Sequence, residues 1–136
     1  MKRRKLLLLL LSLATGGPLL MAATSAEQSS LDPALDPAVV NAEMEHVKLE
    51  NSQVRVIEGV LPPGAKEKMH SHPAFVTYVI AGGRIRNNFA DGKVVEAELK
   101  TGDVLYREPQ THWVENIGTT TLHFLVMELK ELKSPG

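Results

Sequence analysis

Two histidines, His70 and His72, stand one residue apart between a Pro-Pro-Gly turn and an apolar segment. In an extended strand, residues two apart project from the same face and lie about 7 Å apart along the backbone. Two imidazoles on one face can therefore be directed at a single metal ion, for which neutral imidazole is a common protein ligand. A third histidine, His112, lies downstream in a segment of its own and offers a third nitrogen.

Glycine, aspartate, proline and asparagine residues frame the three histidines. The first frame contains Gly64, His70, His72 and Gly82, and the second contains Gly102, Asp103, Pro109, His112 and Asn116. These frames resemble the two motifs of the cupin family, which carry Gly, His-x-His and Gly, and then Gly-Asp, Pro, His and Asn. The resemblance covers about residues 45–131. The segment THWVENIGTTTLHFLVMELK looks most like short single-domain cupins, some of which are labelled β-alanine degradation proteins.

The resemblance implies an all-β fold, a single-domain cupin-type jelly-roll β-barrel or sandwich, with the two motifs on facing strands. It also implies that His70, His72 and His112 bind one divalent metal ion. Three imidazoles would leave positions open for a substrate, which suits catalysis more than structural support. Because imidazole binds Fe, Zn and Ni alike, the expected cofactor is one divalent ion of this group.

The sequence departs from the family pattern at one ligand. Cupins commonly place a glutamate three to four residues after the His-x-His pair, where this chain has Phe75, Val76 or Thr77. Glu67, in the approach loop, reaches the site only if that loop folds back. A divalent ion held by three neutral imidazoles would keep its full charge and favour anionic substrates or hydroxide. A three-histidine metal site and a metal-free barrel therefore both stay open.

Other side chains near the motifs are weaker candidates. Arg84, Arg86 and Arg107 are the cations nearest to the motifs in sequence, and a guanidinium can pair with a substrate carboxylate. Tyr78 is expected to pack in the core with a satisfied hydroxyl. The remaining histidines, His46 and His123, are expected to be ordinary surface or core residues rather than ligands, and no general base is assigned.

Short segments rich in Val, Ile, Thr, Phe and Tyr alternate with turn residues, as is typical of a β-sandwich or barrel. The expected strands are 47–50, 54–61, 75–81, 84–90, 94–99, 104–107, 112–116 and 121–132. Asp91-Gly92 predicts a hairpin, because glycine readily adopts the positive φ that tight turns require. Asp36-Pro37 predicts a capped helical turn reaching about Asn41. The chain contains no cysteine, so neither disulfides nor thiolate ligands are available.

The first 26 residues have the layout of a cleaved signal peptide: four basic residues, an apolar run over 6–11, and small residues near Ala26. Residues 27–44 are interpreted as a flexible lead-in, 45–131 as the barrel domain and 132–136 as a tail. Without the four leader cations, 11 basic residues face 16 acidic ones, a formal charge of −5. We therefore expect a periplasmic or secreted protein without stable membrane insertion after cleavage, and no nucleic-acid partner.

Two functional classes follow from these observations. The first is an exported metal-binding cupin acting on a small anionic organic molecule, as a mononuclear-metal oxygenase or as an isomerase or lyase. The alternative is a non-catalytic module that captures a small ligand or a metal ion. A homodimer, which the resemblance also implies, is compatible with both classes.

Overall fold

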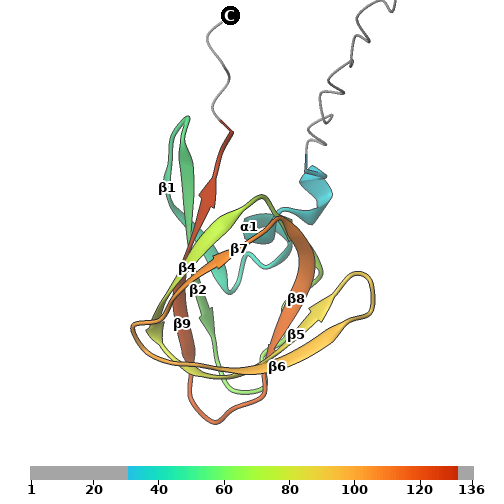
Figure 1. Ribbon diagram of the computed structural model, residues 1–136, viewed down its shortest axis with the longest axis vertical. Coiled ribbons are helices and arrows are strands. Elements are labelled where there is room, and N and C mark those ends of the chain that lie inside the picture. Colours follow the sequence, from blue (N-terminus) through green and yellow to red (C-terminus); the bar gives the residue numbers. More distant parts are fainter. Residues whose placement is uncertain (1–30, 132–136) are drawn as a thin grey trace, which may run out of the picture.

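The computed structural model describes residues 31–131, which form two antiparallel β-sheets curled into a barrel (Figure 1). The strands are β1 (Glu45–Glu50), β2 (Val54–Leu61), β3 (His70–His72), β4 (Phe75–Ala81), β5 (Gly83–Phe89), β6 (Val94–Leu99), β7 (Val104–Arg107), β8 (Gln110–Asn116) and β9 (Leu122–Leu129). The expected all-β jelly-roll is confirmed. The expected signal peptide and the tail over 132–136 lie outside the described residues.

Strand order shows how segments distant in sequence come together. One sheet has the order β1-β2-β9-β4-β7 and the other has the order β3-β8-β5-β6. In the second sheet, β3 pairs with β8 so that His70 faces His112 directly. Cross-strand partners in an antiparallel pair have Cβ atoms about 5 Å apart, so this register brings the two histidine motifs into contact.

Apolar side chains on the inner faces of the two sheets form the core. One cluster contains Ile57, Phe75 and Val126, and a second contains Leu61, Ile85 and Leu122. Ile57 and Leu61 are fully buried, and each such side chain stabilises the fold by about 2 kcal/mol. The aromatic ring of Phe124 packs against both clusters and joins them.

The strands observed agree with those expected, with small differences at their ends. The last expected strand began at 121, and β9 begins at Leu122 and ends at Leu129. The three-residue β3 was not among the expected strands, because so short a segment carries no periodic pattern. The Asp91-Gly92 turn lies where it was predicted, with φ of 90° at Gly92, but Ala90 to Lys93 separate the two strands instead of two residues.

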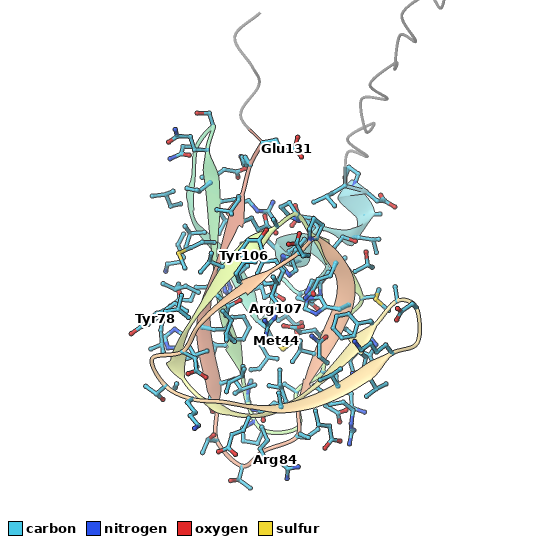
Figure 2. All side chains as sticks on the ribbon, viewed as in Figure 1. Met44, Tyr78, Arg84, Tyr106, Arg107 and Glu131 are labelled. Atoms are coloured by element: carbon cyan, nitrogen blue, oxygen red, sulfur yellow. The ribbon has the colours of Figure 1, made fainter. Side chains whose placement is uncertain are left out.

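The outer face of the five-stranded sheet is apolar and open among the described residues. Tyr78 is 40% exposed, Tyr106 53% and Val104 67%. Tyr78 extends from the outside of the barrel (Figure 2), so the prediction that it packs in the core is wrong. Phe75 and Val79 on the same strand β4 point inward and are buried, since alternate side chains leave opposite faces of a strand.

The described part of the expected lead-in forms two short helical elements that contact the barrel. They are η1 (Pro33–Leu35) and α1 (Pro37–Val40), and Asp36 caps α1 by accepting a 2.9 Å hydrogen bond from the Ala38 N–H, as predicted. Beyond the cap, Asn41 is 3% exposed. Composition favoured a flexible lead-in, yet these polar residues find partners in the barrel. Among residues 31–131, no helix is long and apolar enough to span a membrane.

The side chain of Asn116, the last residue of β8, is hydrogen-bonded to three backbone groups. Its Nδ2 donates to the Leu61 and Thr120 carbonyl oxygens at 2.9 and 2.8 Å, and its Oδ1 accepts from the Gly118 N–H at 3.0 Å. The side chain is 1% exposed, so bulk water has little access to these backbone groups. Asn116 therefore ties down the turn that follows β8.

Replacing Asn116 with Ala is expected to lower the free energy of unfolding by about 3 kcal/mol, because buried backbone groups would lose their partners. Urea unfolding of the metal-free protein measures the change. Asn51 is the matched control, since its exposed Oδ1 accepts from the Gln53 and Val54 N–H groups; Asn51→Ala should cost about 1 kcal/mol or less. Equal losses in the two variants would contradict the role given to Asn116.

Candidate metal centre

The three predicted histidines converge inside the barrel. His70 and His72 leave the same face of β3, and His112 faces them from β8. The ring centroids lie 4.7 to 5.4 Å apart, and one nitrogen from each ring lies within 4.8 Å of the others. The structure therefore brings together the trio that the sequence singled out, and all three side chains are buried.

Oxygen atoms beside the three rings favour a proton on each Nδ1, which leaves Nε2 available. Each Nδ1 lies next to an oxygen acceptor: the Lys68 carbonyl at 2.7 Å from His70, Glu128 Oε1 at 2.7 Å from His72, and Asn87 Oδ1 at 2.8 Å from His112. A ring that donates from Nδ1 keeps its lone pair on Nε2. Partners of this kind orient metal-binding imidazoles and raise their basicity.

The surroundings of His112 indicate whether the three histidines fit a metal ion. The Nε2 atom of His112 is buried and has no hydrogen-bond partner among residues 31–131. A buried polar atom without a partner costs about 1–3 kcal/mol, so its retention calls for a ligand. Three Nε2 lone pairs within reach of one another are suited to a divalent ion that imidazoles bind. The donor set present therefore fits a metal ion.

Burial keeps two of the imidazoles neutral. It lowers the pKa of His70 to about 4 and that of His112 to about 2, with a further lowering by the neighbouring histidines. The ordinary value is about 6.5. Because a metal ion binds the unprotonated ring, both side chains are ready to act as ligands at neutral pH without first losing a proton.

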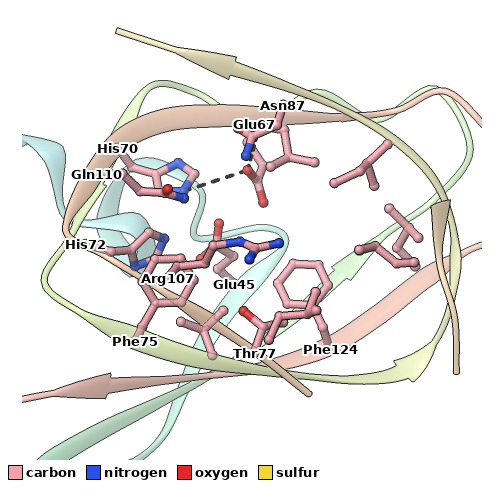
Figure 3. A pocket seen from close by; sticks show the side chains of 16 residues that line it. Glu45, Glu67, His70, His72, Phe75, Thr77, Asn87, Arg107, Gln110 and Phe124 are labelled. Atoms are coloured by element: carbon pink, nitrogen blue, oxygen red, sulfur yellow. Dashed lines mark hydrogen bonds and ion pairs between the residues drawn. The ribbon is translucent and has the colours of Figure 1, made fainter. Parts of the chain in front are cut away.

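Two carboxyl groups lie beside His70, although the family's usual glutamate is missing from β4. Glu67 Oε2 is 3.8 Å from His70 Nε2 (dashed line in Figure 3), and a carboxyl oxygen of Glu45 lies within 4.8 Å of ligand atoms of both residues. Burial, followed by the charge of Glu45, raises the pKa of Glu67 well above its usual range. Burial also raises the pKa of Glu45. The charge of the site is therefore set by these two groups as well as by any ion.

Glu67 reaches the histidines because its loop folds back along β8. Backbone hydrogen bonds join Gly64 and Ala65 to Asn116, and the Glu67 N–H donates to the Val114 carbonyl. In return the Val114 N–H donates to Glu67 Oε2 at 2.9 Å. The loop thus extends the sheet beside β8. Because the loop folds back in this way, Glu67 reaches the site.

Asn41 joins the end of α1 to this group. Its Oδ1 accepts from the Lys68 N–H at 2.7 Å, and its Nδ2 lies 3.2 Å from Glu45 Oε1 and 3.1 Å from His70 Nδ1. One amide side chain therefore binds a carboxyl group and the backbone of the approach loop, and it lies against the ring of His70. Glu45 itself stands at the start of β1 and is 2% exposed.

A series of charged side chains links the Nδ1 side of His72 to the cap of α1. Glu128 accepts from His72 through Oε1, while its Oε2 lies 3.0 Å from Arg55 Nε. Arg55 in turn donates two hydrogen bonds of 2.7 Å to Asp36, the cap of α1. A guanidinium that binds a carboxylate through two parallel bonds is held in one orientation. The N-terminal helix thereby helps to fix the orientation of one imidazole.

His70, His72 and the two carboxyl groups line a cavity of about 90 Å³. Arg107 lines the same cavity, together with apolar side chains that include Leu99, Leu105 and Leu122. Of the three arginines considered from the sequence, only Arg107 lines this cavity; Arg84 and Arg86 pair with Glu96 on the outside. Thr77 is also in the lining and occupies one of the positions where the family places its glutamate.

Several residues of the site were missed from the sequence, and two carried a signal. Glu128 follows Leu122, Phe124 and Val126 on the inward face of β9, so it is a charged residue at an apolar position. Glu45 is likewise inward at the start of β1. By contrast, nothing in the sequence distinguishes Asn41 from other polar residues of the lead-in. His123, expected to be an ordinary residue, lies away from the cavity. Its Nε2 is 2.9 Å from Glu58 Oε1.

The lowered pKa values predict how the metal-free protein responds to pH. Between about pH 4 and 6.5 the unfolded chain binds protons at His70 and His112 that the folded chain does not bind. These histidines therefore make the free energy of unfolding fall as the pH is lowered. Replacing His112 with Gln should flatten this dependence by about 1 kcal/mol per pH unit between pH 5 and 6.

Urea unfolding with a chelator present, at several pH values, measures the two slopes. Glu45 and Glu67 are present in both proteins, so their opposite contribution does not produce a difference in slope. Identical slopes for the wild type and His112→Gln would contradict the lowered pKa of His112.

Comparisons with known proteins agree with this geometry. Residues 57–128, more than half of the chain, match the model of the cupin domain. A cupin domain of Bordetella pertussis is 28% identical, with a TM-score of 0.60 over 65% of this chain and 93% of that one. A protein of Klebsiella pneumoniae with a double-stranded β-helix domain is 25% identical, with a TM-score of 0.51 over 63% of this chain and 75% of that one.

A cupin-like protein of Thermotoga maritima shares the fold at 24% identity, with a TM-score of 0.52 over 63% of this chain and 67% of that one. No curated protein matches the chain. The domain match spans β2 to β9 and contains all three histidines of the site. With its two-sheet barrel and its framed histidines, this chain belongs to the cupin domain family.

Proposed function

We propose that the protein binds one divalent metal ion through Nε2 of His70, His72 and His112. The buried, unpartnered Nε2 of His112 is the observation that carries this proposal. The fixed orientation of all three rings supports it, since each Nδ1 already has an oxygen acceptor. A metal-free barrel would have no reason to keep three neutral imidazoles facing one another in its interior.

The donor set narrows the choice of ion to Fe, Zn or Ni. When bound, the ion would supply Lewis-acid polarisation of a ligand or, as iron, redox chemistry with dioxygen. The proposed activity is accordingly that of a mononuclear-metal oxygenase, or of an isomerase or lyase. In either case the protein's own residues orient the imidazoles and keep them unprotonated.

We further propose that the cavity receives a small organic anion. Arg107 is the only lysine or arginine among its lining residues, which also include His70 and His72. Figure 3 shows its side chain extending toward the middle of the cavity, past Glu45. A carboxylate bound in the cavity would meet a guanidinium, while the apolar lining residues would hold the remainder of the molecule.

Export of the protein remains a proposal that rests on the sequence. The basic residues 2–5 and the leucine run over 6–11 support removal of residues 1–26 by a signal peptidase. The barrel with its metal site would then act in the periplasm or outside the cell.

Metal analysis tests the central proposal. The full chain, expressed and purified without chelators, should contain about one equivalent of Fe, Zn or Ni by mass spectrometry, and His70→Ala should contain less than about a tenth of that. His123→Ala is the matched control, because this histidine pairs with Glu58 on the outer face. Equal and low metal contents in the wild type and His70→Ala would contradict the proposed centre.

The intact mass of the purified protein tests the proposed signal peptide, since the purified chain should begin at residue 27.

Arg107 provides a test of the proposed ligand class. In the metal-loaded protein, Arg107→Gln should weaken binding of the tightest member of a panel of small carboxylic acids about tenfold, measured by calorimetry. Arg84→Gln removes the same charge from an arginine outside the cavity and should leave the affinity unchanged. Equal affinities in both variants would show that Arg107 does not contact the anion.

A further inference from the structure

His70 belongs to two groups of potential metal ligands. One is the trio His70, His72 and His112, and the other consists of Glu45, Glu67 and His70. Within each group, the nitrogen or oxygen ligand atoms all lie within 4.8 Å of one another. The members of both groups are buried, and the first group is the one that carries the proposed function.

The carboxyl pair has no cationic partner comparable to those of other acidic groups. Among the described residues, the acidic side chains that form ion pairs with lysine or arginine are Asp36, Glu50, Glu58, Glu96, Glu115 and Glu128. Glu67 has only the imidazole of His70, at 3.8 Å. Two adjacent buried carboxyl groups are costly to the fold unless a cation or a function compensates them.

A second observation indicates that a ligand belongs in this part of the cavity. His112 Nε2 is buried without a partner, and the ring of His112 lies 4.7 Å from that of His70. His70 therefore lies close to two sets of potential ligand atoms, the nitrogens of His72 and His112 and the carboxyl oxygens of Glu45 and Glu67. In Figure 3, Glu67 and Glu45 approach the cavity on the side away from the backbone of β3.

The distances suit ion binding but not simultaneous occupancy. Donor atoms bound at about 2.1 Å to one ion lie about 3 to 4.2 Å from each other, and the 3.8 Å between Glu67 Oε2 and His70 Nε2 is within this interval. The single lone pair on His70 Nε2 can bind only one ion. The two groups therefore compete for His70.

We propose that His70 is shared by two overlapping ion positions, an imidazole-rich one with His72 and His112 and an oxygen-rich one with Glu45 and Glu67, of which one is filled at a time. The metal's ligand preference decides between them. Ions such as Ni²⁺ prefer the imidazoles, whereas Mn²⁺ prefers a position with two carboxylates. The first position rests on the proposed function, and the second rests on the carboxyl pair.

The two positions differ in their effect on the cavity. In the imidazole-rich position the three ligands are neutral, so none of them offsets the ion's charge of +2, and the ion attracts anions together with Arg107. In the oxygen-rich position two carboxylates neutralise that charge. The identity of the ion would thus change the affinity of the same cavity for an anion.

Metal titrations of the full chain, freed of metal, test this proposal. Mn²⁺ binding is followed by loss of the free-ion electron paramagnetic resonance signal, and Ni²⁺ binding by calorimetry. Glu67→Gln should weaken Mn²⁺ binding at least tenfold and change Ni²⁺ binding less than twofold. His112→Gln should show the reverse pattern, His70→Ala should lose both ions, and Ni²⁺ should displace Mn²⁺ from the wild type.

Controls separate ligand loss from damage to the fold. Glu58→Gln removes a carboxylate that pairs with a histidine on the outer face, and it should bind both ions as the wild type does. Glu45→Gln provides a second variant of the oxygen-rich position if Glu67→Gln does not fold, and circular dichroism checks each protein.

Two outcomes would overturn the inference. In the first, Glu67→Gln and Glu45→Gln bind Mn²⁺ as tightly as the wild type. In the second, Glu67→Gln and His112→Gln each weaken both ions, which would mean that one ion contacts both groups. Failure of the proposed function looks different, because His112→Gln would then leave Ni²⁺ binding unchanged while the Mn²⁺ results still test the carboxyl pair.

Discussion

The pairing of β3 with β8 is the constraint on which the site depends. It places His70 opposite His112 and puts His72 on the same inward face. A shift of this register by one residue would turn the histidines of one strand away from those of the other, because side chains alternate between faces. Ser71 and Thr111 form the next residue pair along these two strands, and the 2.7 Å hydrogen bond between their hydroxyl groups supports the register.

Around that pairing, oxygen acceptors from other parts of the chain orient the histidines. The Lys68 carbonyl, Glu128 and Asn87 lie beside the three Nδ1 atoms and leave each Nε2 available to a metal ion. Such second partners restrict rings that could otherwise rotate. Burial of the three histidines costs free energy. The apolar clusters around Ile57 and Leu61, on the adjoining part of the inner faces, stabilise the barrel and offset this cost.

The carboxyl groups change the electrostatic description of the centre. Three histidines alone would leave a bound ion with its full charge, but Glu45 and Glu67 lie close enough to His70 to alter that charge. They enter from β1 and from the approach loop, whereas the family's usual glutamate would come from β4, where Thr77 now stands. The same requirement for a nearby carboxylate can therefore be met from another direction in the barrel.

The sequence by itself determined the barrel, most strand limits and the three histidines, because these depend on alternation, turn residues and motif spacing within short segments. The turn-forming Asn116 and the capping Asp36 were predictable for the same reason. Glu45, Asn41 and Glu128 could not be assigned to the site, since their neighbours there are distant in sequence. Only the tertiary structure decided that Glu67 faces His70 and Tyr78 faces outward, because both depend on how the approach loop and the sheets pair in space.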